Sequence, residues 1–169
     1  MRLLFLVSVI VALVSFGCQS TRNAEFGIYL LTDDRPATEL AQSDLNDLPL
    51  QDKPLISSAD IVAYHKGDHI IELTPSAYAK VQAIFPKPVR VDGIPFVVAV
   101  GDERIYAGGF WTPLSSRSYD GVVILEPWEA LPTDIRIGLG YPSTELFVHT
   151  DPRSDPRIIE ALEQANKIK

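Results

Sequence analysis

Two histidines and an aspartate in one short stretch are the residues best suited to metal chemistry. His65, Asp68 and His69 surround Lys66 and Gly67. Imidazole and carboxylate are zinc ligands, and three protein ligands plus a water would make a catalytic site. A three-residue loop between flanking strands would put both imidazoles on one side, whereas a two-residue turn would put them on opposite faces. Polar turn residues without a metal are the alternative interpretation.

A second group of residues has the composition of an interaction surface. Phe110, Trp111, Arg117 and Tyr119 lie between two predicted strands. Aromatic residues together with arginine are the usual anchors of protein interfaces, and irregular segments often carry function. The alternative is that the aromatic side chains belong to the core.

Cys18 is the only cysteine, and it ends an apolar segment at the N-terminus. Arg2 precedes an apolar run over residues 3–14 that only Ser8 interrupts, and Ser15-Phe16-Gly17-Cys18 closes it. A positive start, an apolar run and a small residue before the cut are typical of a secretory signal. The run is shorter than the roughly 20 residues that a membrane-spanning helix needs.

The Ser15-Phe16-Gly17-Cys18 sequence resembles the lipobox of bacterial lipoprotein signals, although Ser15 and Phe16 differ from the usual residues. The resemblance implies a signal peptide over residues 1–17, acylation of Cys18, a polar tether over residues 18–25 and one domain over residues 26–169. Two or three acyl chains would make the attachment effectively permanent, since one chain alone gives only marginal binding. Gln19, rather than aspartate, favours the periplasmic side of the outer membrane in a Gram-negative organism. An ordinary cleaved signal and an uncleaved anchor are the alternatives.

The composition excludes one large class of partners. The formal net charge is −7, and no basic cluster with interleaved aromatic residues appears. Such a surface repels nucleic acid. About 150 residues remain after removal of the signal, which is the size of one ordinary domain. No residue pattern predicts a cofactor.

The hydrophobic patterns predict an α+β fold with an antiparallel-rich sheet and two main helices packed on it, at about residues 75–85 and 155–168. Thr74-Pro75 and Asp155-Pro156 open these helices as cap and first helical residue. Ser57 and Asp60 fit a capping box and favour a short third helix, with a strand over residues 60–64 as the alternative. The predicted strands cover residues 26–32, 69–73, 95–100, 104–110, 121–126 and 134–139.

The middle of the chain offers a second resemblance. Ile70-Ile71-Glu72-Leu73-Thr74 leads into the first long helix, and a hairpin then runs to Gly108-Gly109-Phe110. This layout is similar to the periplasmic head of the SecD export protein. The resemblance implies no role for any single residue.

Together these features predict a lipid-anchored protein of the cell envelope that binds or assembles with an envelope protein and is not an enzyme. One alternative is an envelope hydrolase that uses His65, Asp68 and His69. Another is a purely structural envelope lipoprotein.

Overall fold

The structure is a computed structural model that describes residues 24–85, 87–88, 90–128 and 132–169. The predicted signal peptide, its cleavage site and Cys18 lie outside the described residues. The first strand of the described residues is β1 (Phe26–Leu30), and Phe26 is fully buried.

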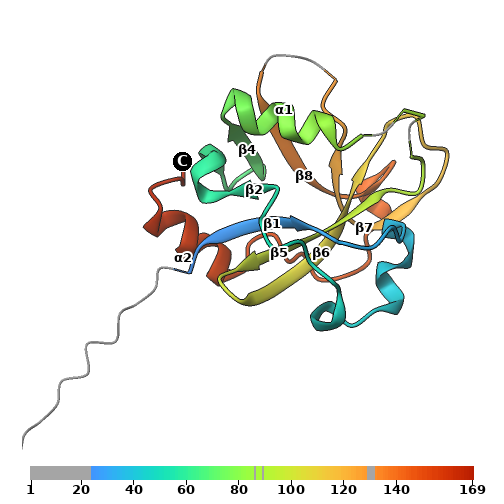
Figure 1. The fold of residues 1–169 in the computed structure, drawn as a ribbon, viewed down its shortest axis with the longest axis horizontal. Coiled ribbons are helices and arrows are strands. Elements are labelled where there is room, and N and C mark those ends of the chain that lie inside the picture. The colour runs from blue at the N-terminus through green and yellow to red at the C-terminus, as the bar shows by residue number, and fades with distance from the viewer. Residues whose placement is uncertain (1–23, 86, 89, 129–131) are drawn as a thin grey trace, which may run out of the picture.

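Eight strands form one strongly curled sheet, which confirms an α+β fold (Figure 1). Neighbouring strands are antiparallel except for one parallel pair, β6 with β7. The two ends of the strand order are consecutive in the chain and joined only by the 3-10 turn η3 (Ser58–Asp60), so the sheet curls back toward itself. The order is β2-β1-β5-β6-β7-β8-β4-β3, with β2 at Ile56–Ser57, β3 at Ile61–His65, β4 at Ile70–Leu73, β5 at Ile94–Val100, β6 at Glu103–Trp111, β7 at Tyr119–Leu125 and β8 at Asp134–Tyr141.

Two α-helices begin where the sequence predicts. In α1 (Pro75–Ala83) the hydroxyl of Thr74 accepts a bond from the amide of Ala77, at 3.2 Å. In α2 (Pro156–Gln164) the carboxylate of Asp155 accepts from the amide of Arg157, at 2.9 Å. Each cap satisfies an amide that has no partner within its helix. Both helices contribute buried residues to the main core cluster.

The last helix is shorter than predicted. The sequence suggests a helix to residue 168, but α2 ends at Gln164 because Asn166 takes a left-handed φ of 56°. The chain then runs extended beside β3, where the amide of Tyr64 donates to Lys167 and the amide of Lys169 donates to Tyr64. Ile168 is therefore paired with the sheet edge rather than part of a helical stripe.

The capping box at Ser57 is present but starts only one 3-10 turn, and β3 follows it directly. The amide of Ser57 donates to Asp60 at 2.9 Å. The strand alternative is thus confirmed, and the predicted short helix is wrong. The reason is the pairing of β3 with β4, which continues from Ile61 to His65 and outweighs a local capping signal.

The middle of the sheet is covered on both faces. The main cluster fills the inside of the curl, and it includes Phe96, Val98 and Ile124. A second cluster lies on the outer face, where η1 (Ala37–Gln42), η2 (Leu45–Asp47) and the chain around Leu48 cover β5 and β6. Central strands buried on both faces explain the continuous apolar runs of β5 and β7.

Candidate functional site

The structure separates the three predicted metal ligands. His65 is half-buried, and its Nε2 lies 2.6 Å from Oε1 of Glu72 on β4. His69 is buried, and its Nδ1 lies 2.7 Å from the hydroxyl of Tyr64. Tyr64 and His65 are consecutive on β3, so their side chains lie on opposite faces of the strand. The contact between His65 and Glu72 and the contact between His69 and Tyr64 are therefore on opposite faces. Asp68 is exposed in the turn, and the described residues hold no group of three potential metal ligands. The structure therefore does not have the arrangement in which both imidazoles lie on one side.

His69 instead belongs to a buried polar contact beneath the C-terminal loop. Burial raises the pKa of Tyr64 to about 12, so its hydroxyl stays protonated beside Nδ1 of His69. Burial, aided by the positive charge of Arg153, lowers the pKa of His69 below its ordinary value. Arg153 forms an ion pair with Asp151 and donates to the carbonyl of Ile137, at 2.8 Å. This arrangement joins the turn before β4, strand β8 and the C-terminal loop.

The contact predicts a pH-dependent stability. Unfolded histidine titrates near pH 6.5, and folded His69 titrates lower, so the unfolded state binds more protons as the pH falls through this range. The free energy of unfolding therefore decreases with acidification and levels off below the folded pKa. Asp68, Asp151 and Arg153 face the same ring and set this shift together with burial. Urea denaturation at several pH values between 7.5 and 5 measures the effect.

His69→Asn should flatten this part of the pH profile, because asparagine tolerates the φ of 55° but does not titrate. His149→Asn is the matched control, since His149 lies on the surface with its side chain 59% exposed. An unchanged profile in His69→Asn would contradict the assignment of the pH dependence to this ring.

The predicted aromatic interaction surface is corrected by the structure. Phe110 and Trp111 are fully buried, Tyr119 is nearly so, and only Arg117 is exposed. The Trp111 and Tyr119 rings stack at a centroid distance of 4.9 Å in the outer cluster. The segment over residues 37–50 covers these rings. No local pattern around Trp111 indicates that this segment covers them. The core alternative is therefore the correct one for the three aromatic residues.

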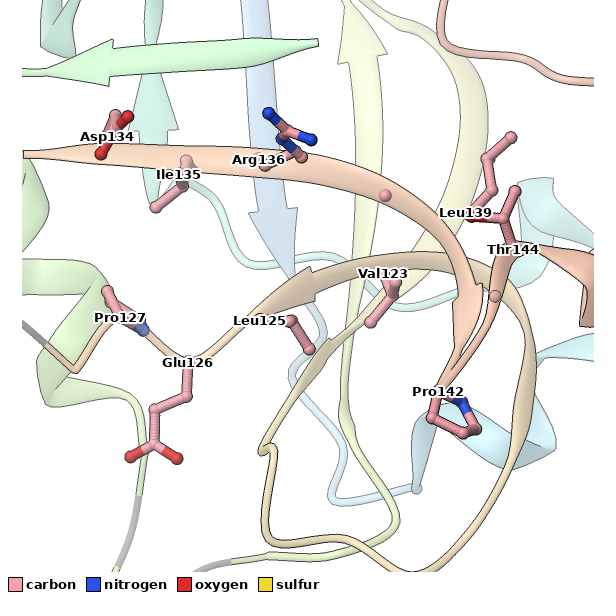
Figure 2. Close-up of a pocket in the computed structure, with 12 residues that line it drawn as sticks. Val123, Leu125, Glu126, Pro127, Asp134, Ile135, Arg136, Leu139, Pro142 and Thr144 are labelled. Atoms are coloured by element: carbon pink, nitrogen blue, oxygen red, sulfur yellow. The ribbon is translucent and has the colours of Figure 1, made fainter. Parts of the chain in front are cut away.

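A pocket of about 310 Å³ opens where β7 and β8 separate. The last residue pair between them is Ile124 with Ile137, and the two strands diverge beyond it. Figure 2 shows the lining side chains coming from β7 and β8 and from the loops that follow them. Among them are Val123, Leu125, Pro127, Arg136, Gly138, Pro142 and Thr144.

The pocket combines an apolar floor with a charged edge. Val123 and Leu125 come from one face of β7, and Gly138 lies opposite Val123 on β8. Leu125 is 44% exposed, although it is a large apolar residue within a strand. Asp134 and Arg136 project from the same side of β8 in Figure 2, two residues apart. The side chains of Asp134 and Arg136 have no hydrogen bond or ion pair to another described residue. Glu126 is a third charged residue of the lining, and its Oε2 is buried without a hydrogen-bond partner among the described residues.

Comparison with known proteins identifies no relative. A scan against protein-family models and searches of the curated proteins and the solved structures find no match for this chain. The site must therefore be interpreted from its own geometry.

The pocket lies at the end of the sheet opposite the point where the chain enters the domain. The amide of Gly101, in the turn between β5 and β6, donates to the carbonyl of Glu25 at 2.9 Å. From there β6 runs nine residues to Trp111, which is paired with Leu125 at the pocket. At about 3.3 Å per residue, this distance is on the order of 25 Å.

Among the helices of the described residues, none is both long and apolar enough to cross a membrane.

No pattern in the sequence indicates Leu125, Arg136 or Gly138 as site residues. The alternation of β8 predicts Arg136 to point outward, which is confirmed, but the pattern is typical of any half-buried strand. The pocket depends on where pairing between β7 and β8 stops, and that is a property of the sheet rather than of either strand.

Proposed function

We propose that this chain is an exported protein, acylated on Cys18, that serves in the cell envelope as a lipid-anchored binding or assembly module. The observation that carries the proposal is Ser15-Phe16-Gly17-Cys18 directly after an uncharged apolar run. A domain whose first core residue is Phe26 leaves a short polar tether after Cys18. Such a tether would hold the folded domain close to a bilayer.

The pocket between β7 and β8 supports binding rather than a purely structural role. It brings exposed apolar surface together with three charged residues, Glu126, Asp134 and Arg136. Convergent polar groups at the edge of an apolar pocket are the usual composition of a binding site. The histidines offer less support for a hydrolase, since His65 and His69 are each engaged by a neighbouring side chain on opposite faces of β3.

The expectation about which membrane holds the protein depends on Gln19. Aspartate after the acylated cysteine retains lipoproteins of enteric-type bacteria at the inner membrane, and glutamine does not. We therefore place this protein at the periplasmic side of the outer membrane in a Gram-negative host. Crosslinking in the native membrane, followed by mass spectrometry, would identify the envelope protein that it contacts.

Cys18→Ser is expected to move the protein from the membrane pellet to the soluble fraction, because no thiol remains to carry acyl chains. Fractionation and intact mass of the mature N-terminus measure the effect. Ser20→Ala is the matched control and should stay in the pellet with the acylated mass. A Cys18→Ser protein that matures identically and remains membrane-bound would contradict the proposal.

A further inference from the structure

We propose that the pocket between β7 and β8 binds an alkylammonium group, meaning a primary ammonium on a short apolar chain. The chain lies on Val123, Leu125 and Gly138, and the ammonium meets the carboxylate of Asp134. Such a group can come from a free amine or from a lysine side chain of a partner protein. This inference rests on the proposed binding function and names the chemistry of the ligand.

The charges of the lining favour a cation. Two carboxylates, those of Glu126 and Asp134, line the pocket together with one guanidinium, that of Arg136. Figure 2 shows Asp134 on β8 and Glu126 beyond the end of β7, so the acidic residues lie on the two sides of the opening. Arg136 is exposed, and water screens its charge. Oε2 of Glu126 is buried without a described partner, and a charge in such surroundings acts over a longer distance. The electrostatic potential in the pocket is therefore negative.

Asp134 is the residue placed to receive the ammonium. It is half-buried, and it lies directly opposite Glu72 on β4, an arrangement of like charges that destabilises a sheet. Nε2 of His65 lies 2.6 Å from one oxygen of Glu72, and Nζ of Lys169 lies 3.1 Å from the other. No described side chain offers Asp134 a cation in this way. A ligand ammonium would supply it through a charge-assisted hydrogen bond.

The floor of the pocket provides the apolar contact. A side chain at Gly138 would meet Cγ1 of Val123 at 3.3 Å and would occupy the pocket. The backbone of Gly138 is not left-handed, so glycine is not required there by conformation. Its missing side chain leaves room for methylene groups beside Val123 and the exposed Leu125. A volume of about 310 Å³ lies at the small end of the range for ligand sites and suits a short chain.

The position of the pocket favours a ligand from the aqueous phase. The pocket lies at the end of β6 and β7 remote from Glu25, where the tether of a lipid-anchored chain would begin. The amine headgroups of the anchoring bilayer would be at the other end of the domain. A free amine or another protein can reach the pocket while Cys18 stays in the bilayer.

The test is a solution NMR titration of isotope-labelled full-length protein in zwitterionic detergent micelles, with butylamine as the probe. The amides of Leu125, Asp134 and Gly138 should shift saturably, with a dissociation constant below about 10 mM. Butan-1-ol has the same chain without the charge and should bind at least about tenfold more weakly. Butyrate carries the opposite charge and should not saturate these shifts. Ethylamine should also bind more weakly, because each buried methylene contributes up to about fourfold in affinity.

Variants separate the charge from the floor. Asp134→Asn should weaken butylamine binding about tenfold and leave butan-1-ol binding unchanged. Arg136→Gln should strengthen butylamine binding about threefold, because it removes an exposed like charge. Gly138→Val fills the pocket and should weaken both probes. Glu163→Gln is the matched control, since Glu163 is exposed on α2 and does not line the pocket. Melting temperatures confirm that each variant is folded.

A short peptide with a central lysine and blocked ends distinguishes the two sources of the ligand. Peptide binding at least as tight as that of butylamine, lost when norleucine replaces the lysine, supports the inference with a partner protein as the source. Saturable binding of butylamine without the peptide supports it with a free amine as the source.

Saturable binding of neither butylamine nor the lysine peptide up to about 10 mM would overturn the inference. Binding that butyrate matches, or that Asp134→Asn does not weaken, would overturn it as well. These outcomes leave the proposed function standing, because membrane attachment through Cys18 and crosslinking to an envelope partner are measured separately.

Discussion

Trp111→Ala is expected to lower the free energy of unfolding by about 3–5 kcal/mol, which is the usual cost of removing a large buried aromatic side chain. Trp111 is fully buried in the outer cluster, stacked on Tyr119 and tilted against Tyr141 at a centroid distance of 5.9 Å. The loss leaves a cavity that the rigid sheet and the covering segment can only partly fill. Urea denaturation followed by circular dichroism measures the change.

The other tryptophan of the chain is the matched control. Trp128 is 59% exposed, so Trp128→Ala should change the free energy of unfolding by no more than about 0.5 kcal/mol. A Trp111→Ala protein as stable as wild type would contradict the core position and restore the interaction-surface interpretation of Phe110, Trp111 and Tyr119.

Gly93→Ala is expected to cost about 2–5 kcal/mol, for two separate reasons. Gly93 has a φ of 78°, and a left-handed conformation costs a residue with a Cβ roughly 1–2 kcal/mol. Its Cβ would also lie 2.5 Å from the Trp111 ring and 2.9 Å from Cβ of Ala37, and overpacking of this kind adds about 1–3 kcal/mol. The same denaturation experiment measures the sum.

Gly67→Ala separates backbone strain and crowding from a general effect of replacing glycine. Gly67 is exposed, has no left-handed φ and offers open space for a Cβ, so this change should be nearly neutral. Combining Gly93→Ala with Trp111→Ala should cost less than the sum of the two, because the alanine then meets a cavity instead of a ring. Strict additivity would show that the ring does not crowd this position.

The strands of the sheet were largely predictable because their local patterns and their burial agree. The hairpin at Gly101 follows from a turn sequence between two β-rich segments, and β7 follows from an unbroken apolar run. The helix starts at Thr74 and Asp155 were equally clear, since a cap is a local interaction between residues three or fewer positions apart.

The errors occurred where distant segments decide the outcome. Residues 37–50 bury Trp111, and no pattern near Trp111 reveals that they cover it. The pairing of Lys167–Lys169 with Tyr64 draws the C-terminus out of the helix predicted to residue 168. The partners of His65 and His69 depend on the register between β3 and β4, which fixes the face on which each ring lies.

The sequence by itself determined the α+β class, most strands, both helix starts and the expectation that Cys18 is the point of attachment to a membrane. These features depend on neighbours in the chain, so local chemistry is sufficient. Only the tertiary structure decided which aromatic residues are buried, that the two histidines are separated, and that a pocket opens beside Arg136. Each of these depends on how strands far apart in the chain pair and where that pairing ends, and local propensity carries no information about it.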